Sequence, residues 1–375
     1  MICVGRGSVN MSELSENGNG PENNGKVNTF EERGFCAFVD KHGVTRSLVA
    51  TRIEAFRGIL AEADVAWVDY MLLDFMNESI EVARALGFSE LLVKNLVKNE
   101  RSGYEDFETE MGLLLPAMDV DEFDVKLKPL LILIKKNVVV TLHTTETSRF
   151  FRVRRYAETL LKKLPHQAQQ KDRITILLSR IIEENNAKNF DHLREIEEQG
   201  DQMSRELSDP KTPRDVIGPK IYKMKHALIV YLGGLWATID ALNALRYGDA
   251  ELMTDDTKII HRLKGLVSEV GTQIGLAEHL SEVLASGLEV LQSIYNNQLQ
   301  ILNNRLALMV AYLTIIGTAL LVPNTIATVA GNSMFGFTQN DVGWYLSLIV
   351  ISTVFATILA WFVVKKLGLL PSSPE

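Results

Sequence analysis

The run LALMVAYLTIIGTALLVPNTIATVA, from Leu306 to Ala330, contains no charged residue. At 1.5 Å per residue, an uncharged helix of this length crosses a hydrocarbon layer of roughly 30 Å. Toward the N-terminus no proline interrupts the chain before Thr254–Asp255–Asp256, which suit the N-cap and first turn of a helix. We therefore predict one long helix that begins in water and ends as a membrane span, bent at Pro323.

Uncharged polar residues recur along one line of this helix, at alternating spacings of four and three. The line comprises Ser293, Asn297, Gln300, Asn304, Ala307, Ala311, Thr314, Thr318, Leu321, Thr325, Thr328 and Asn332. Because an unsatisfied polar group in hydrocarbon is costly, the line must face a partner helix or water. Two interpretations fit. Either the line packs against another helix, with threonines bonded to their own backbone, or several copies of the helix present rings of oxygens around a water-filled axis.

The first half of the long helix carries an apolar line in a different phase. It comprises Leu263, Val267, Val270, Ile274, Ala277, Ser281, Leu284, Leu288, Leu291 and Tyr295. Apolar residues at heptad spacing pack against neighbouring helices. Ordinary core packing is the favoured interpretation of these residues. Since a helix of this length buries little against itself, the line also indicates self-association.

A second uncharged run, Val342–Val364, ends at Lys365 and Lys366. Basic residues at the end of a span favour the cytoplasmic side. The first 28 residues are rich in Gly, Asn, Ser and Glu and contain no apolar signal sequence, so we expect a disordered tail. Together these features predict a multi-pass protein of the plasma membrane with both termini in the cytoplasm.

Composition excludes several functional classes. The net charge of −8 argues against nucleic-acid binding. The only cysteines, Cys3 and Cys36, cannot form a disulfide framework and indicate a reducing compartment. The sequence has no Cys/His cluster with zinc spacing, no nucleophile–base pair and no phosphate-binding glycine loop. We therefore expect neither an enzyme nor an organic cofactor.

The soluble region divides into an α/β part and a helical part. Short runs rich in Val, Ile and Leu predict strands at Gly34–Asp40, Val65–Tyr70, Glu108–Ala117, Phe123–Lys135 and Asn137–Thr144. Helices are expected at 51–62, 74–86 and 89–98. Beyond the last strand the pattern becomes helical, at Arg149–Leu164, Asp172–Leu207 and Lys220–Tyr247. Three prolines and a glycine in Ser208–Pro219 predict a break that makes the last two of these helices antiparallel.

The expected organisation has seven segments. They are a disordered tail (1–28), a cytosolic α/β domain (29–147), antiparallel cytosolic helices (148–252), the stalk helix with the first span (253–332), an outer loop (333–341), the second span (342–364) and a basic cytosolic tail (365–375).

Three motifs in this arrangement resemble the CorA family of divalent-cation channels. They are VAWVDY at residues 65–70, LILIKKNVVVTLHTT at 131–145 and LTIIGTALLVPNTIATVAGN at 313–332. The resemblance covers nearly the whole chain from about residue 30. It implies a funnel-shaped homopentamer that passes Mg²⁺, with Co²⁺, Ni²⁺ and Zn²⁺ as further candidates. The long helix would form the pore wall, and the second span would form an outer ring.

The family signature Gly-Met-Asn is altered in this chain to Gly331-Asn332-Ser333. In CorA proteins the asparagine ring is thought to hold a hydrated magnesium ion at the pore entrance. The resemblance therefore implies that Asn332 and Ser333 hold a hydrated ion through amide and hydroxyl oxygens. Because methionine is replaced and serine stands in the asparagine position, selectivity for magnesium does not carry over.

The same resemblance assigns the pore. Thr328, Thr325, Thr318 and Thr314 would line it below the outer ring, and Leu321, Leu308 and Ala311 are candidate constrictions. Acidic residues at 119–124 and 249–256 are candidates for a regulatory Mg²⁺ site in the family, but such clusters are more often solvated turns or helix caps, and we do not assign them. Two alternatives stay open: a ZntB-like proton-coupled transporter of transition metals, and a membrane-anchored sensor or assembly protein that does not conduct.

Overall fold

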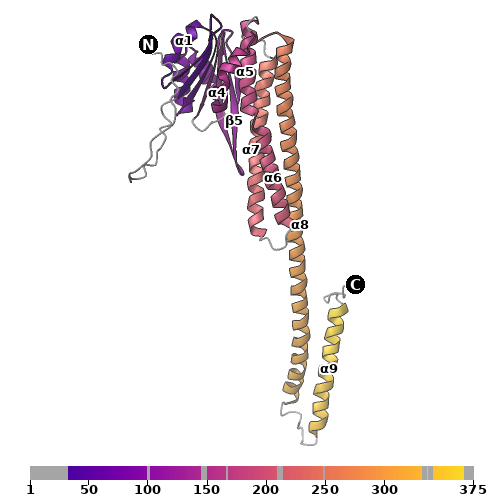
Figure 1. Cartoon of the computed structure of the whole chain (residues 1–375). Helices are drawn as coiled ribbons and strands as arrows, with labels where there is room; N and C mark the ends of the chain where they lie inside the picture. The colour runs from indigo at the N-terminus through magenta and orange to yellow at the C-terminus, as the bar shows by residue number, and fades with distance from the viewer. Residues whose placement is uncertain are drawn as a thin grey trace, which may run out of the picture. The chain divides into compact units, whose positions relative to one another are not determined.

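The computed structural model describes residues 33–98, 102–144, 150–165, 168–208, 214–247, 250–331, 336 and 341–366 (Figure 1). The predicted tail at 1–28 lies outside these residues. Two compact units divide the chain. The first comprises residues up to Asp121, Val125–His192 and Val230–Ile274, and the second comprises Glu122–Asp124, Leu193–Ile229 and everything from Gly275 onward.

A seven-stranded sheet forms the centre of the first unit, in the order β2-β1-β3-β7-β6-β5-β4. β3 and β7 at the middle of the sheet are parallel, whereas β1 pairs antiparallel with β2 and β3, and β6 pairs antiparallel with β7. The strands are β1 (Gly34–Asp40), β2 (Thr45–Ala50), β3 (Ala63–Leu72), β4 (Gly103–Asp106), β5 (Glu110–Asp121), β6 (Asp124–Lys135) and β7 (Val138–Thr144).

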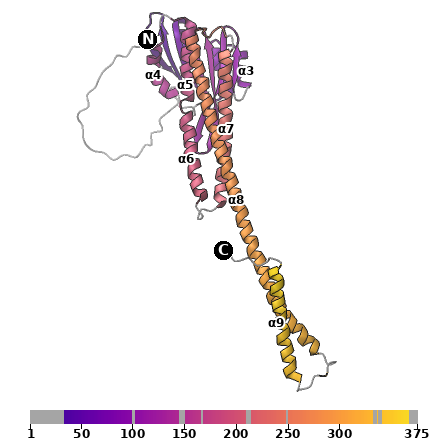
Figure 2. The same ribbon diagram turned by 90° about the vertical axis from the view of Figure 1, so that its right-hand side faces the viewer.

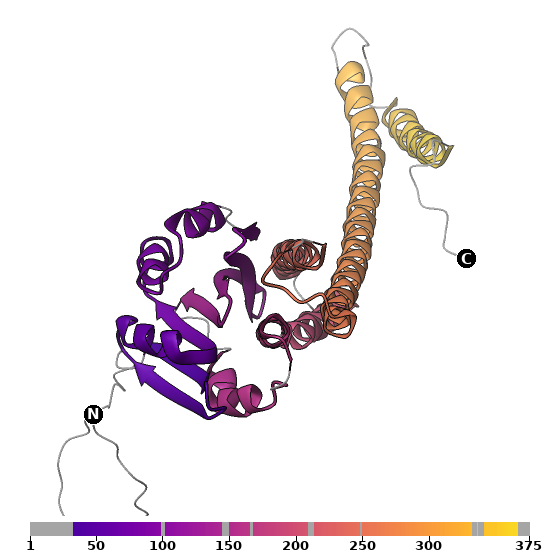
Figure 3. The ribbon, with the colours of Figure 1, turned by 90° about the horizontal axis from the view of Figure 1, so that it is seen from above.

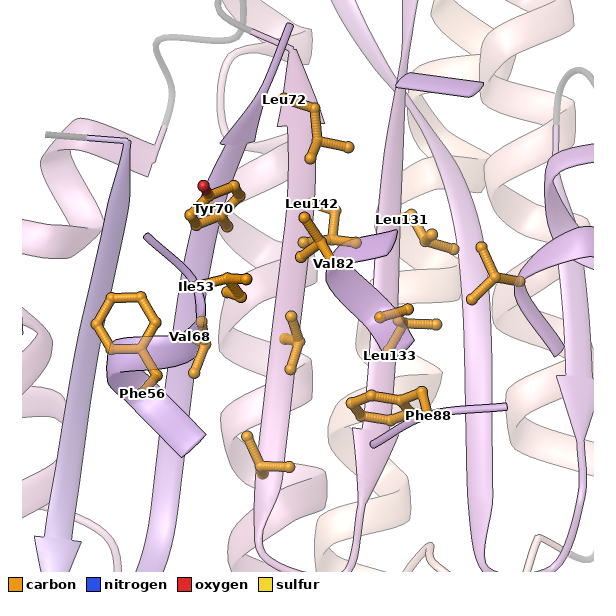
Figure 4. Packing of buried hydrophobic residues seen from close by; sticks show 14 of the residues in the cluster. Ile53, Phe56, Val68, Tyr70, Leu72, Val82, Phe88, Leu131, Leu133 and Leu142 are labelled. Atoms are coloured by element: carbon orange, nitrogen blue, oxygen red, sulfur yellow. The ribbon is translucent and has the colours of Figure 1, made fainter. Parts of the chain in front are cut away.

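One face of the sheet is covered by α1 (Glu54–Glu62), α2 (Phe75–Ala85) and α3 (Glu90–Lys98). Figure 4 shows Phe56 of α1, Val82 of α2 and Phe88 lying over the apolar side chains of the strands. Alternate residues of the central strands, such as Val68 and Leu142, point into this layer because successive strand residues face opposite sides. Burial of their apolar side chains stabilises this layer.

The opposite face is covered by α4 (Phe150–Lys162), α5 (Gln170–Asn186) and the second half of α7 (Arg214–Tyr247). Figure 3, seen from above, shows helices on both sides of the sheet. Gly234 allows α7 to approach the strands closely. A Cβ at this position would lie 2.8 Å from Leu127 Cδ2 and 3.0 Å from Met118 Sδ.

The structure confirms the five predicted strands, with shifts of one to four residues at some ends. It adds β2 and β4, which the sequence pattern missed. Both are edge strands with a single neighbour. The middle of β2 is exposed, so it lacks the alternation of apolar and polar residues that identifies a half-buried strand.

The predicted single helix Asp172–Leu207 is wrong, because the chain breaks between α5 and α6 (Asn189–Ser208). Two asparagines at the break have buried side chains that bond outside their own helix. Asn185 Nδ2 donates to Pro116 O at 3.0 Å, and Asn189 Nδ2 donates to Gln273 Oε1 at 3.1 Å. Asparagine has a low helix propensity, and these bonds stabilise the interruption.

The expected antiparallel pairing of α6 with α7 is confirmed within the second unit. Lys220 Nζ lies 2.8 Å from Glu206 Oε2, while Gly200 faces the side chain of Met224. However, α7 begins at Arg214, not at Lys220, and so contains Pro219. A proline this close to the start of a helix removes one backbone hydrogen bond but leaves the rest of a long helix intact.

α8 (Thr257–Ala330) confirms the predicted long helix, which has 74 residues and passes through Pro323 (orange in Figure 2). The N-cap is Asp256, not Thr254: the Asp256 carboxylate accepts the Lys258 N–H at 2.7 Å, and its carbonyl accepts the Ile260 N–H at 2.9 Å. The apolar line is largely buried, at Leu263, Val270, Ile274, Ala277, Leu284 and Leu291, but Tyr295 is exposed. The last helix, α9, spans Val342–Lys366.

Candidate functional site: the polar line of α8

Four predicted pore threonines lie on one face of α8. At 100° per residue, Thr314, Thr318, Thr325 and Thr328 fall within an arc of about 80°. Each hydroxyl donates to the backbone carbonyl four residues earlier. These bonds measure 2.8 Å to Val310 O, 2.8 Å to Thr314 O, 2.8 Å to Leu321 O and 2.7 Å to Asn324 O, respectively.

This bonding fixes what the threonines offer to a ligand. A hydroxyl can donate one hydrogen bond and accept two, and here its one donated bond goes to a helix carbonyl. The oxygen therefore presents only acceptor sites to its surroundings. A surface of this kind accepts hydrogen bonds from water molecules, including those around a cation.

The three candidate constriction residues differ in their surroundings. Leu321 lies on the same face as the threonines and is 67% exposed in the single chain. Leu308 lies roughly a quarter turn or more away from that face. Ala311 is only 1% exposed, so the chain itself already covers it. None of these observations tests a constriction, and all three assignments stay predictions.

The altered signature lies at the end of α8. Gly331 forms the turn after the helix, and its N–H donates to Ala327 O at 2.9 Å. A Cβ at Gly331 would lie 3.0 Å from that same oxygen, a close contact. Asn332 and Ser333 lie outside the described residues, so their predicted role in holding a hydrated ion stays a prediction.

By length and composition, three described helices are apolar enough to cross a membrane: Val216–Tyr247, Thr257–Val329 and Val342–Lys366. They differ in burial. Half of the apolar window in α7 is buried inside the chain, whereas the windows in α8 and α9 are almost entirely exposed. The apolar window of α7 is thus half covered by the chain itself, whereas the apolar windows of α8 and α9 are not.

No regulatory metal site is evident among the described residues. No group of three or more His, Cys, Asp or Glu side chains in that part of the chain is arranged to hold a metal ion. One member of the first acidic segment, Asp119, pairs with Lys128 at 2.7 Å. Asp249, in the second segment, lies outside the described residues.

A polar cluster that the sequence pattern did not predict joins the motifs at residues 65–70 and 131–145. The parallel pairing of β3 with β7 places Asp69 of VAWVDY level with Thr141, and Met71 level with His143. Asp69 Oδ1 accepts a hydrogen bond from Thr141 Oγ1 at 2.6 Å and lies 3.1 Å from His143 Nε2. Arg154 of α4 donates to Asp69 Oδ2 at 2.6 Å. Charged residues inside otherwise apolar strands were the signal for this cluster.

A family model described as CorA-like Mg²⁺ transporter protein matches residues 62–366. A search of curated proteins found no significant match.

Solved structures share the fold. The CorA magnesium transporter from Methanocaldococcus jannaschii is 17% identical over 90% of this chain and 99% of its own, with a TM-score of 0.64. The full-length CmaX protein is 15% identical over 91% and 99%, with a TM-score of 0.54. The ZntB cytoplasmic domain from Vibrio parahaemolyticus is 15% identical over 71% and 99%, also with a TM-score of 0.54. At these identities the likeness concerns the fold alone.

Proposed function

The chain belongs to the CorA-like Mg²⁺ transporter family, and from this we propose that it conducts divalent cations, Mg²⁺ first among them, through a pore lined by α8. The observation that carries the proposal is the line of threonines on α8. Their oxygens are held as acceptors along an exposed, uncharged face.

The chemistry of magnesium favours such a face. Mg²⁺ sheds its water reluctantly, so a conducting protein gains by binding the hydrated ion. The coordinated waters donate hydrogen bonds, and acceptor oxygens receive them. Neutral oxygens also avoid binding so tight that the ion cannot leave. The absence of charged residues between Arg305 and Asp341 fits both requirements.

The pore requires several copies of the chain. Two membrane helices cannot enclose a water-filled axis. The face that carries the threonines also stays exposed in the single chain, where the Leu321 side chain is 67% exposed. We propose a homopentamer, as the family resemblance implies, in which Asn332 and Ser333 form the outer ring. Leu321 would then project toward the axis as the hydrophobic constriction.

The proposed topology has two spans, in α8 and α9, with both termini in the cytoplasm. Lys365 and Lys366 at the end of α9 favour that side of the plasma membrane. In this orientation the membrane potential favours an entering dication by roughly 4.6 kcal/mol per 100 mV. No coupled ion is then needed for uptake.

Flux into proteoliposomes tests the proposal. The purified chain should admit Mg²⁺, Co²⁺, Ni²⁺ or Zn²⁺ when the interior is negative. Thr325→Val and Thr328→Val keep the side-chain shape but remove the acceptor oxygen, so both should reduce the flux severalfold. Thr353→Val in α9 is the matched control, because Thr353 makes the same backbone bond, to Ile349 O at 2.6 Å. The absence of any dication flux would overturn the proposal.

One other transport mechanism is compatible with the fold. The likeness to the ZntB cytoplasmic domain leaves room for a proton-coupled transporter of Zn²⁺ or another transition metal. Uptake driven by a pH gradient at zero voltage would favour that mechanism over a channel.

The altered Gly331-Asn332-Ser333 motif is the main support for a further alternative, a sensor or assembly protein that does not conduct. A protein of this kind would form an intact oligomer that passes no ions. Replacing Asn332 and Ser333 by alanine would then change no phenotype.

A further inference from the structure

An open cavity of about 540 Å³ lies between α4, α5 and the start of α8, within the first unit. Its volume falls in the range of small-molecule binding sites, roughly 300–1,000 Å³. Part of its lining is apolar, at Val153, Leu160, Leu164 and Ile176. Charged side chains from all three helices or their ends also line it, and their arrangement decides which ligand fits.

α4 and α5 run antiparallel along this cavity. Residues 163–169 connect the end of α4 to the start of α5, whereas Arg152, in the first half of α4, pairs with Glu184 near the end of α5. Arg152 Nε lies 2.8 Å from Glu184 Oε1, and Tyr156 OH donates to Glu184 Oε2 at 3.0 Å. Lys163, directly after α4, therefore lies at the end of the cavity near the start of α5, and Glu184 lies at the opposite end.

α8 runs alongside α5 in the same direction. Thr254, just before α8, donates its N–H to Thr175 Oγ1 at 3.1 Å, and farther along Asn189 Nδ2 donates to Gln273 Oε1 at 3.1 Å. Arg262 lies between these two contacts along α8 and lines the cavity. A third element thus adds a cation to the cavity that α4 and α5 form.

The carboxylates at one end of the cavity already have cationic partners. Arg152 pairs with Glu184, and Arg180 Nη1 lies 2.6 Å from Glu183 Oε2. Glu269 of α8 does not line the cavity but lies close enough to be affected: burial and then Glu183 raise the pKa of Glu269. This end has no excess of positive charge, and its carboxylate oxygens can accept hydrogen bonds from a ligand.

Two other cations of the cavity have no such compensation. The side chains of Lys163 and Arg262 form no hydrogen bond, ion pair or ring contact with the part of the chain that the structure describes. Lys163 is exposed and Arg262 is half-buried, so both can reach a ligand. An ammonium binds phosphate as a point charge, and a guanidinium binds it through two parallel hydrogen bonds. These two side chains therefore form a region suited to phosphate groups.

We propose that this cavity binds a nucleotide, with its phosphates at Lys163 and Arg262 and its base against the apolar lining. Hydroxyl or amino groups of the sugar and base then donate to Glu183. An inorganic phosphate would leave most of the volume and the apolar lining unused. An uncharged apolar ligand would cover two cations without giving them a partner, which is costly.

Calorimetric titration of the full chain in detergent tests the proposal. EDTA removes divalent cations, so the nucleotide is free of metal. ATP and ADP should bind, whereas adenosine and pyrophosphate, which each supply only one half of the contacts, should bind at least about tenfold more weakly than ATP.

Variants of the two uncompensated cations locate the site. Lys163→Gln and Arg262→Gln should each weaken ATP binding by about tenfold or more, because each removes charge-assisted hydrogen bonds. Lys162→Gln and Lys264→Gln are the matched controls: both lysines are exposed, lie next to or two residues from the tested cations, and do not line the cavity. Both controls should keep the wild-type affinity.

Three results would overturn the nucleotide site: no ATP binding to the wild-type chain, pyrophosphate or adenosine binding as tightly as ATP, or equal weakening by the tested variants and their controls. The unfolding midpoint without ligand checks the fold of each variant. If Arg262→Gln does not fold, the ligand series and Lys163→Gln still decide. No readout involves ion flux, so the nucleotide site and the proposed transport function stand or fall separately.

Discussion

The sheet of the first unit and the outer half of α8 are both rich in Leu, Ile and Val, yet they treat these residues in opposite ways. In β6 and β7, the side chains from Leu130 to Ile134 and from Val138 to Leu142 are buried within the chain. In α8, Leu313, Leu320 and Leu321 are mostly exposed. The sheet buries its apolar residues within one chain, whereas the outer half of α8 leaves them exposed; under the proposed function they face lipid on one side and other copies of the chain on another.

The largest expected change in the free energy of unfolding is in the sheet core of the first unit. Phe56→Ala opens a cavity in the layer over the sheet and should lower the free energy of unfolding by about 3–5 kcal/mol. Denaturant titration of the purified protein measures the change. Val49→Ala, at an exposed residue of the edge strand β2, is the control and should change it by less than about 0.5 kcal/mol. Equal effects at both positions would show that the sheet core is not the source of stability.

The second prediction compares an arginine inside the proposed span of α8 with one outside it. Leu320 and Leu302 are 68% and 53% exposed on the same helix, but only Leu320 lies in the uncharged run. Leu320→Arg should oppose membrane insertion by about 2.5–3.5 kcal/mol, and Leu302→Arg should have little effect. The fraction of protein that resists alkaline extraction from membranes reports the difference. Equal loss in both variants would contradict the assigned span.

A smaller effect concerns the break between α5 and α6. Asn185→Ala leaves the buried carbonyl of Pro116 without its 3.0 Å hydrogen bond. The free energy of unfolding should fall by about 1–3 kcal/mol. Thermal unfolding of the purified variant measures this loss, and an unchanged melting temperature would mean that the break does not depend on this bond.

The smallest effect is expected at a surface ion pair. Arg194 and Glu198 are 3.2 Å apart on α6 and both are highly exposed. Arg194→Ala should change the free energy of unfolding by only about 0.3–0.5 kcal/mol, and less at high salt. A change above 1 kcal/mol would show that α6 has a partner that covers this face.

Much of the fold followed from periodicity. Strand β1 was predicted with its observed bounds. The long helix was predicted from the lack of proline between Thr254 and Val322 and from the uncharged run Leu306–Ala330. Prediction failed where tertiary contacts override local preference. Asn185 and Asn189, on either side of the break between α5 and α6, bond to partners distant in sequence, and Asp69 meets Arg154 only after the sheet and α4 have packed.

The sequence predicted that the candidate pore threonines share one face of a helix, but it did not predict what surrounds that face. Spacing alone placed Thr314 to Thr328 on one side of α8. Backbone hydrogen bonds of these threonines were expected under the packing interpretation, and the structure shows them. Whether the threonine face lines a pore depends on how copies of the chain assemble. Asn332 and Ser333, the proposed outer ring, lie outside the described residues.

Accessibility of single cysteines to a charged, membrane-impermeant thiol reagent tests the central claim most directly. Thr325→Cys and Leu320→Cys place the same thiol about 140° apart around α8 and about 7.5 Å apart along it. We predict that the reagent modifies Thr325→Cys and blocks dication flux into proteoliposomes, while Leu320→Cys stays unmodified and conducts. Modification of Leu320→Cys with no reaction at Thr325→Cys would contradict a water-filled axis lined by the threonines.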